Sequence, residues 1–87
     1  MNYTYILLCS DKTYYIGWTN NLDKRLMVHN EGKGAKYTRG RRPVILVYWE
    51  EHSSRSEAQK GEAALRRLSR EQKEALINEF NLKRMKV

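Results

Sequence analysis

Two strand-like segments decide the fold: Tyr3-Thr4-Tyr5-Ile6-Leu7-Leu8-Cys9 and Tyr14-Tyr15-Ile16-Gly17-Trp18-Thr19. Both are rich in β-branched and aromatic residues, and the polar turn at residues 10–12 separates them, so together they predict a β-hairpin. A loop with an odd number of residues would place Tyr5, Tyr15 and Gly17 on one face and Ile6, Leu8, Ile16 and Trp18 on the other. A two-residue loop would separate the tyrosines, but the turn lacks the Asn-Gly or Asp-Gly pair that favours one. We therefore expect the odd loop.

The rest of the chain predicts one more strand and three helices. Thr19 or Asn20 can cap a helix that ends near Glu31, on which Arg25 and His29 lie one turn apart on the same side. The apolar run at 44–49 predicts a third, central strand that is covered on both faces. Capping-box patterns that begin at Ser54 and Ser69 predict helices at about 55–67 and 70–80.

The element order β-β-α-β-α-α predicts the α+β class. We expect a single domain over residues 1–87, with a core at about 3–80 and a frayed basic tail at 81–87. Its predicted architecture is a three-stranded, mostly antiparallel sheet flanked by helices.

Composition excludes several classes of protein. The 87 residues can bury only one small core, since a chain of this size hides roughly 60–65% of its unfolded surface. Cys9 is the single cysteine, and with His29 and His52 it offers too few ligands for a closed zinc site. No apolar run approaches the length of a membrane span or a signal sequence. These features favour a reduced, cytoplasmic setting.

Positive charge is concentrated in one segment. The chain carries seventeen Lys and Arg against ten Asp and Glu, a net charge of +7. Residues 33–49 contain five bases and no acid. Interleaved with Tyr37, this segment is typical of a loop that follows a phosphate backbone; a solvated surface loop is the alternative. The candidate nucleic-acid-binding residues here are Lys33, Lys36, Tyr37, Arg39, Arg41 and Arg42.

The hairpin and the residues after it resemble the GIY-YIG nuclease superfamily. The motif residues are Thr4-Tyr5, Tyr15-Ile16-Gly17, Asn21-Leu22, Arg25 and His29, followed by Gly34 to Pro43 and then Glu57-Ala58 with Glu62. Within the superfamily, residues 3–80 are similar to small stand-alone bacterial GIY-YIG domain proteins. They are also similar to the nuclease subunit of eukaryotic structure-specific endonucleases. The chain departs from the pattern at Tyr3 and Thr4, which replace glycine and isoleucine, and at Gly61, a poor helix residue.

The resemblance implies hydrolysis of phosphodiester bonds with one divalent cation, Mg²⁺ or Mn²⁺, bound together with substrate. The catalytic residues it implies are Tyr5, Tyr15, Arg25, His29 and Glu62, with Glu62 as the metal ligand. We assign water activation to Tyr5 with His29 as relay, phosphate positioning to Tyr15, and charge stabilisation to Arg25. Gly17 would let the backbone approach the substrate. Taken singly, these residues have ordinary structural explanations: cross-strand packing for the tyrosines, and a salt bridge or a solvated surface for Arg25 and Glu62.

We therefore expect a DNA endonuclease that selects DNA structure rather than sequence and favours branched, nicked or single-stranded substrates. The alternative is a non-catalytic nucleic-acid-binding module of the same fold, which works with a protein partner that supplies substrate selection. RNA is a further candidate ligand, since Tyr37 and the basic segment could also stack on unpaired bases.

Overall fold

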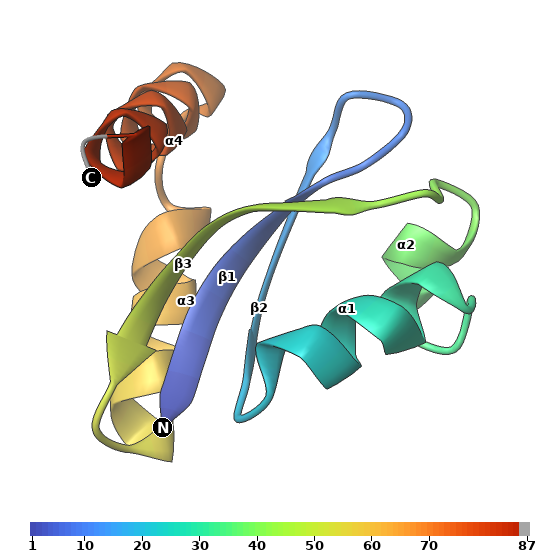
Figure 1. Ribbon diagram of the computed structural model, residues 1–87, viewed down its shortest axis with the longest axis horizontal. Helices are drawn as coiled ribbons and strands as arrows, with labels where there is room; N and C mark the ends of the chain where they lie inside the picture. Colours follow the sequence, from blue (N-terminus) through green and yellow to red (C-terminus); the bar gives the residue numbers. More distant parts are fainter. Residues whose placement is uncertain (86–87) are drawn as a thin grey trace.

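Three antiparallel strands form the centre of the molecule, in the spatial order β2-β1-β3 (Figure 1). The computed structural model describes residues 1–85. The strands are β1 (Asn2–Leu8), β2 (Tyr14–Thr19) and β3 (Ile45–His52). The helices are α1 (Leu22–Asn30), α2 (Lys36–Arg39), α3 (Arg55–Arg66) and α4 (Arg70–Met85). The expected α+β class and antiparallel sheet are confirmed.

The β1–β2 hairpin has the expected odd loop. Leu8 pairs with Tyr14 at the end of the ladder, which leaves residues 9–13 as the connection. Tyr5 pairs with Gly17 and Leu7 with Tyr15, so both motif tyrosines lie on the same face of the sheet. Ile6 and Ile16 pair on the opposite face, as the alternation predicts.

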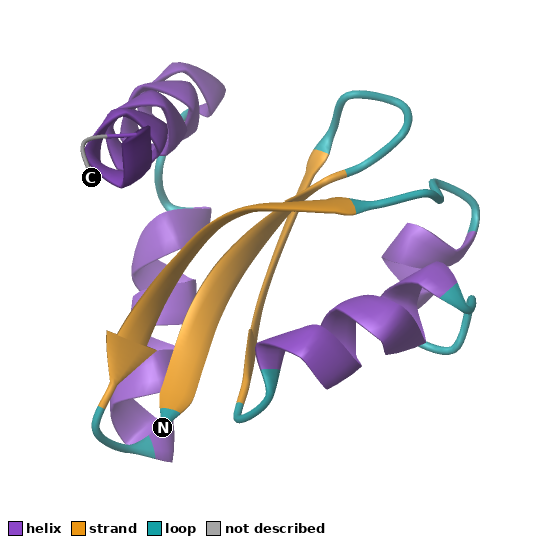
Figure 2. Ribbon diagram, viewed as in Figure 1, coloured by secondary structure: helices purple, strands orange, loops and turns teal. Residues whose placement is uncertain are grey.

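Helices lie on both sides of the sheet (Figure 2). Each face of the sheet carries its own apolar cluster. On the Ile6 face, α3 and α4 contribute buried Leu65 and Ile77. On the Tyr5 face, Leu22 and Leu26 of α1 pack against the sheet beside Leu7, Cys9 and Val44. The sheet is therefore a middle layer, and β1 is its buried central strand.

The prediction that the 44–49 run forms the central strand is wrong. β3 pairs only with β1 and lies at an edge of the sheet. Its apolar run reflects cover on both faces: Tyr48 packs in the α3–α4 layer and Leu46 in the α1 layer. Burial of the two faces predicts apolar side chains, but it does not determine how many strand neighbours the backbone has.

The helices also differ from the expected pattern in three places. Asn21, rather than Thr19 or Asn20, caps α1 by accepting from the Lys24 amide. The order is β-β-α-α-β-α-α, because a short helix, α2, forms within the basic segment that was expected to be a loop. α4 continues to Met85, so residues 81–85 of the expected frayed tail are helical, while residues 86–87 lie outside the described part. Within residues 1–85, no helix is long and apolar enough to cross a membrane.

Gly61 permits close contact between α3 and the sheet. A Cβ atom at this position would lie 2.7 Å from Thr4 Oγ1, 2.8 Å from Glu50 Oε1 and 2.8 Å from His52 Nε2. Thr4 is fully buried and donates its hydroxyl to the Ala58 carbonyl at 2.7 Å, which joins β1 to α3. Two of the three departures from the family pattern, Thr4 and Gly61, thus belong to one packed contact.

We expect Gly61→Ala to lower the free energy of unfolding by about 1 kcal/mol. Alanine gains ~1 kcal/mol of helix propensity, but overpacking costs about 1–3 kcal/mol and here involves an anchored threonine. Gly61→Val should lose several times more, because it adds bulk and reduces the propensity gain. Urea denaturation followed by circular dichroism measures both effects.

Gly40→Ala is the matched control. No atom lies within 4 Å of a Cβ built on Gly40, so its stability should stay within ~0.5 kcal/mol of the wild type. An increase in stability for Gly61→Ala would show that the contact with Thr4 does not limit helix packing.

Candidate active site

A buried hydrogen bond joins the first strand to the first helix. The Tyr5 hydroxyl lies 3.0 Å from His29 Nε2. Tyr5 is 2% exposed and His29 fully buried. β1 positions Tyr5 on the α1 face, and the helical spacing aims His29 at the sheet while Arg25, one turn earlier, is exposed.

Thr38 of α2 determines which ring nitrogen of His29 carries the proton. The Thr38 hydroxyl donates to the Ala35 carbonyl at 2.9 Å, so its oxygen must accept from the His29 Nδ1–H, also 2.9 Å away. Nε2 of the neutral ring is then unprotonated and accepts from the Tyr5 hydroxyl. Burial, aided by the charge of Arg25, lowers the pKa of His29 and favours this neutral form.

Two glycines provide the space for this pair. A Cβ on Gly17 would lie 2.6 Å from the Tyr5 hydroxyl oxygen, and one on Gly34 would overlap the His29 ring. The close approach that Gly17 permits is therefore to Tyr5, directly across the ladder from it. A methyl group at either position would push the phenol and the imidazole apart.

The phenol of Tyr5 lies in a strongly charged environment. Burial raises the pKa of Tyr5 to about 12; Arg25 beside the hydroxyl opposes the shift, while Tyr15 and the Glu62 carboxylate reinforce it. The structure therefore brings Tyr15, Arg25, His29 and Glu62 within electrostatic or direct contact of the Tyr5 hydroxyl. By itself this environment keeps Tyr5 protonated at neutral pH.

Glu62 and Arg66 reach the site from the opposite layer, around the edge strand β2. Arg66 lies one turn after Glu62 on α3, and the two side chains form an ion pair of 2.7 Å. Arg66 also donates to the Ile16 carbonyl at 3.1 Å, which ties α3 to the motif strand. Because β2 lies at the edge, this carbonyl is accessible to a side chain rather than to another strand.

Aromatic rings extend the site toward α2. The Tyr15 ring lies 5.3 Å from the His29 ring and 6.0 Å from that of Tyr37, with which it stacks at 28°. The Arg41 guanidinium covers Tyr37 at 4.0 Å. This row places exposed Tyr37 beside the candidate catalytic residues.

The basic segment divides into two groups. Arg41 forms an ion pair with Asp11 at 2.9 Å and donates to the Tyr37 carbonyl, so it holds α2 against the hairpin loop. Arg42 donates to the Arg39 carbonyl at 2.8 Å. The side chains of the other three bases are exposed and, as far as residues 1–85 are concerned, form no ion pair: Lys33, Lys36 and Arg39.

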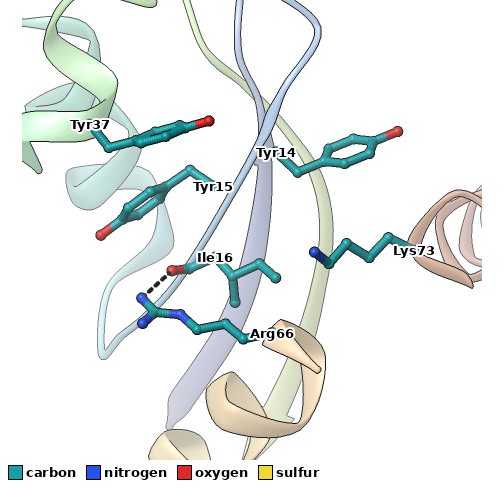
Figure 3. Close-up of a pocket in the computed structure, with 6 residues that line it drawn as sticks. All are labelled: Tyr14, Tyr15, Ile16, Tyr37, Arg66 and Lys73. Atoms are coloured by element: carbon teal, nitrogen blue, oxygen red, sulfur yellow. Dashed lines mark hydrogen bonds between the residues drawn. The ribbon is translucent and has the colours of Figure 1, made fainter. Parts of the chain in front are cut away.

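A pocket of about 280 Å³ opens beside the candidate catalytic residues (Figure 3). It is lined by Tyr14, Tyr15, Ile16, Tyr37, Arg66 and Lys73. Sequence reasoning missed Arg66, Lys73 and Thr38. The (i, i+4) spacing of Glu62 and Arg66 could have indicated their ion pair, whereas Thr38 and Lys73 carry no local signal.

The oxygen donors fit a hard divalent cation that shares its coordination with substrate. Mg²⁺ is usually held by one or two carboxylates together with water and phosphate oxygens. The Glu62 side chain is 20% exposed, and its contact with Arg66 uses only Oε2. Within residues 1–85, no three His, Cys, Asp or Glu side chains gather as a metal cluster. Water and a substrate phosphate would have to supply the other ligands.

Comparison with known proteins gives one family. Residues 1–75 match the model of the GIY-YIG catalytic domain. The chain is 54% identical over 83 residues to a UPF0213 protein of Clostridium perfringens, an alignment that covers 95% of this chain and 89% of the relative. It is also 51% identical over 77 residues to a UPF0213 protein of Halobacterium salinarum, covering 88% of this chain and 100% of the relative.

Two solved structures are similar to the chain. The solution NMR structure of a UPF0213 protein of Bacillus halodurans has a TM-score of 0.57 and 47% identity, covering 90% of this chain and 84% of that one. The solution NMR structure of an E. faecalis protein has a TM-score of 0.60 and 47% identity, and the match covers 93% of this chain and 86% of that one. The similarity of the chain to these proteins therefore covers most of its length.

We expect stability to fall as the pH is lowered from 7 toward 5. Because the pKa of His29 is lowered in the folded protein, the unfolded chain, with a histidine pKa of about 6.5, binds more protons in this range. The stabilising difference is present above the unfolded pKa and is lost as the pH falls. Urea denaturation at several pH values measures it, and nitrogen-15 NMR should show the proton on Nδ1.

His29→Gln should flatten this dependence, whereas His52→Gln should leave it in place, since His52 lies on the opposite side of the sheet in contact with Glu50. A charged His29 ring at pH 6.5, or a proton on Nε2, would contradict the assigned hydrogen-bond directions.

Proposed function

Because the chain belongs to the GIY-YIG family, we propose that it is a DNA endonuclease that hydrolyses phosphodiester bonds with one Mg²⁺ or Mn²⁺ ion. The observation that carries the proposal is the 3.0 Å contact between the Tyr5 hydroxyl and His29 Nε2, the nitrogen that Thr38 leaves unprotonated. This pair gives the hydroxyl proton a defined acceptor, which ordinary cross-strand packing does not require.

Tyr5 and His29 would move the proton of the attacking water. As the Tyr5 proton passes to His29 Nε2, the phenolate oxygen takes a proton from water, and the water oxygen forms a bond to phosphorus. The bond from phosphorus to the sugar oxygen breaks, and that oxygen finally takes a proton from solvent. His29 accepts only one proton, because Nδ1 already carries the one shared with Thr38.

Positive charge makes this transfer feasible. Arg25 already opposes the rise in the pKa of Tyr5, and its exposed guanidinium can pair with the phosphoryl oxygens as their charge grows. Tyr15, which stands beside the His29 ring, would position the phosphate. A cation held by Glu62 and the phosphate would supply Lewis-acid chemistry and stabilise the leaving oxygen.

The exposed bases would hold the rest of the nucleic acid. Lys33, Lys36 and Arg39 are the best candidates, because Arg41 and Arg42 have contacts within the protein. Phosphate contacts of this kind carry no sequence information. We therefore propose selection of DNA structure rather than sequence, with branched, nicked or single-stranded DNA favoured, and binding that weakens steeply with salt.

A nuclease assay with Mg²⁺ or Mn²⁺ on labelled single-stranded, duplex, nicked and branched DNA tests the proposal. We expect Glu62→Gln to reduce cutting by about 10²–10³-fold, the typical loss when a group that stabilises transition-state charge is removed. DNA binding should be retained. Tyr5→Phe should also abolish cutting, because it removes the proton-transfer group.

Glu57→Gln is the matched control, since Glu57 lies on the same helix but is exposed and pairs with Lys60. It should cut like the wild type. Binding without cutting in all variants, wild type included, would favour a non-catalytic module that works with a partner protein. Equal cutting by wild type and Glu62→Gln would refute the assigned site.

The cutting rate should stay nearly constant between about pH 7 and 9 and fall in more acidic solution. The relay needs a neutral His29 ring to accept the Tyr5 proton, and burial lowers the pKa of His29, so the ring is already neutral throughout the upper range. Single-turnover rates measured with saturating metal report this dependence. A rate that rises about tenfold per pH unit up to pH 9 would mean that the phenolate has to form before the reaction, without transfer to His29.

A further inference from the structure

The pocket beside the catalytic cluster is built by four separate elements. β2 contributes Tyr14, Tyr15 and Ile16, and α2 contributes Tyr37. α3 contributes Arg66 and α4 contributes Lys73, and both cations project toward the pocket (Figure 3). Because Tyr15 and Arg66 also touch His29 and Glu62 respectively, the pocket is continuous with the candidate active site.

The side chains that line this pocket include two cations: Arg66 is paired with Glu62, which lies outside the lining, whereas Lys73 has no acidic partner in residues 1–85. None of the described residues that line it is acidic. Lys73 is only partly exposed, and its ammonium group forms no hydrogen bond or ion pair with any group in residues 1–85. Arg70, also on α4, lies 4.8 Å from the Tyr14 ring centroid but is paired with Glu74 at 3.9 Å. A half-buried cation without a protein partner is the expected complement of an anionic ligand.

The shape and walls limit which anion fits. At about 280 Å³ the pocket falls just below the usual range for sites that enclose a drug-sized molecule, so it suits one nucleotide unit rather than a base pair. Its walls are largely tyrosine rings, which provide π surfaces and edges for any base without selecting one. Its two cations, Arg66 and Lys73, can each bind an oxygen of a backbone phosphate.

We infer that this pocket binds one unpaired nucleotide of the substrate strand, immediately beside the bond that is cut. Lys73 and Arg66 hold its phosphate, and the rings of Tyr14 and Tyr37 contact its base and sugar. The base has to leave its stack to enter, so the protein acts on strands that are unpaired at this position. The inference rests on the proposed function for its substrate class and specifies which strand that function requires.

Fluorescence anisotropy tests the pocket without any cutting. The probes are a fluorescein-labelled single-stranded oligonucleotide and the blunt duplex of the same sequence, both in EDTA over a range of salt concentrations. Lys73→Gln should weaken binding to the single strand roughly threefold to tenfold and reduce the slope of log K against log salt by about 0.7. Duplex binding should be unchanged.

Two further variants test whether the loss of single-strand binding is specific to the pocket. Tyr14→Leu keeps an apolar side chain but loses the ring, and should weaken single-strand binding about fivefold or more. Lys83→Gln is the control, because Lys83 lies on the same helix but pairs with Glu79 at 3.2 Å; it should bind both probes like the wild type.

The outcomes separate the two proposals. Selective loss of single-strand affinity in Lys73→Gln supports the pocket even if the wild-type protein cuts none of the substrates, which would refute only the nuclease proposal. If the wild type cuts DNA, but Lys73→Gln and Tyr14→Leu match it on both probes, the pocket proposal is overturned and the nuclease proposal stands. Equal weakening on single strand and duplex also overturns it, since a general charge effect then explains the result.

Discussion

The hydrogen bond between Tyr5 and His29 is the contact on which the rest of the arrangement depends. It joins β1 to α1, and through Thr38 it extends to α2. Leaving a buried polar group without its partner costs about 1–3 kcal/mol, so docking of each of the three segments favours docking of the others. Gly17 and Gly34 are part of this requirement, because each leaves room for one ring of the pair. Packing of the α1 layer and assembly of the candidate site are therefore energetically coupled.

Much of the fold could be predicted from local patterns. The alternation in the two motif segments and the length of their loop determine the face on which each tyrosine lies, and the reciprocal capping box of Ser69 and Gln72 forms as expected. The place of β3 could not be predicted in this way. Its apolar run reflects the packing of other elements against both of its faces. Its position in the sheet depends instead on which side of β1 is left free by β2.

The candidate site, like the fold, could be predicted from the sequence only in part. The helical spacing predicted that Arg25 and His29 share one side of α1, but it did not predict that one is exposed and the other fully buried. The roles of Arg41 and Thr38 depend on partners distant in the chain or in a separate element: Arg41 pairs with Asp11, thirty positions away. Arg66 reaches the site only because α3 passes the edge of β2. Contacts of this kind exist only after the layers have packed.

The electrostatics of Tyr5 suit a site that is inactive until it is assembled. Burial holds the proton on the phenol, and Arg25 only partly opposes it. In the proposed mechanism, further positive charge comes only from the cation, which Glu62 and the substrate phosphate would hold together. A buried general base of this kind would not activate water in the free protein, so hydrolysis would be coupled to substrate binding.

The bond from Arg66 to the Ile16 carbonyl also has a consequence for the behaviour of the protein in solution. β2 is an edge strand, and such strands tend to recruit strands from neighbouring molecules, which leads to aggregation. At Ile16 the outward backbone acceptor is already occupied by a charged side chain. An intruding strand would have to displace that arginine and bring its own backbone next to a guanidinium and a carboxylate. The contact that brings α3 to the site thus also protects the open side of the sheet from self-association.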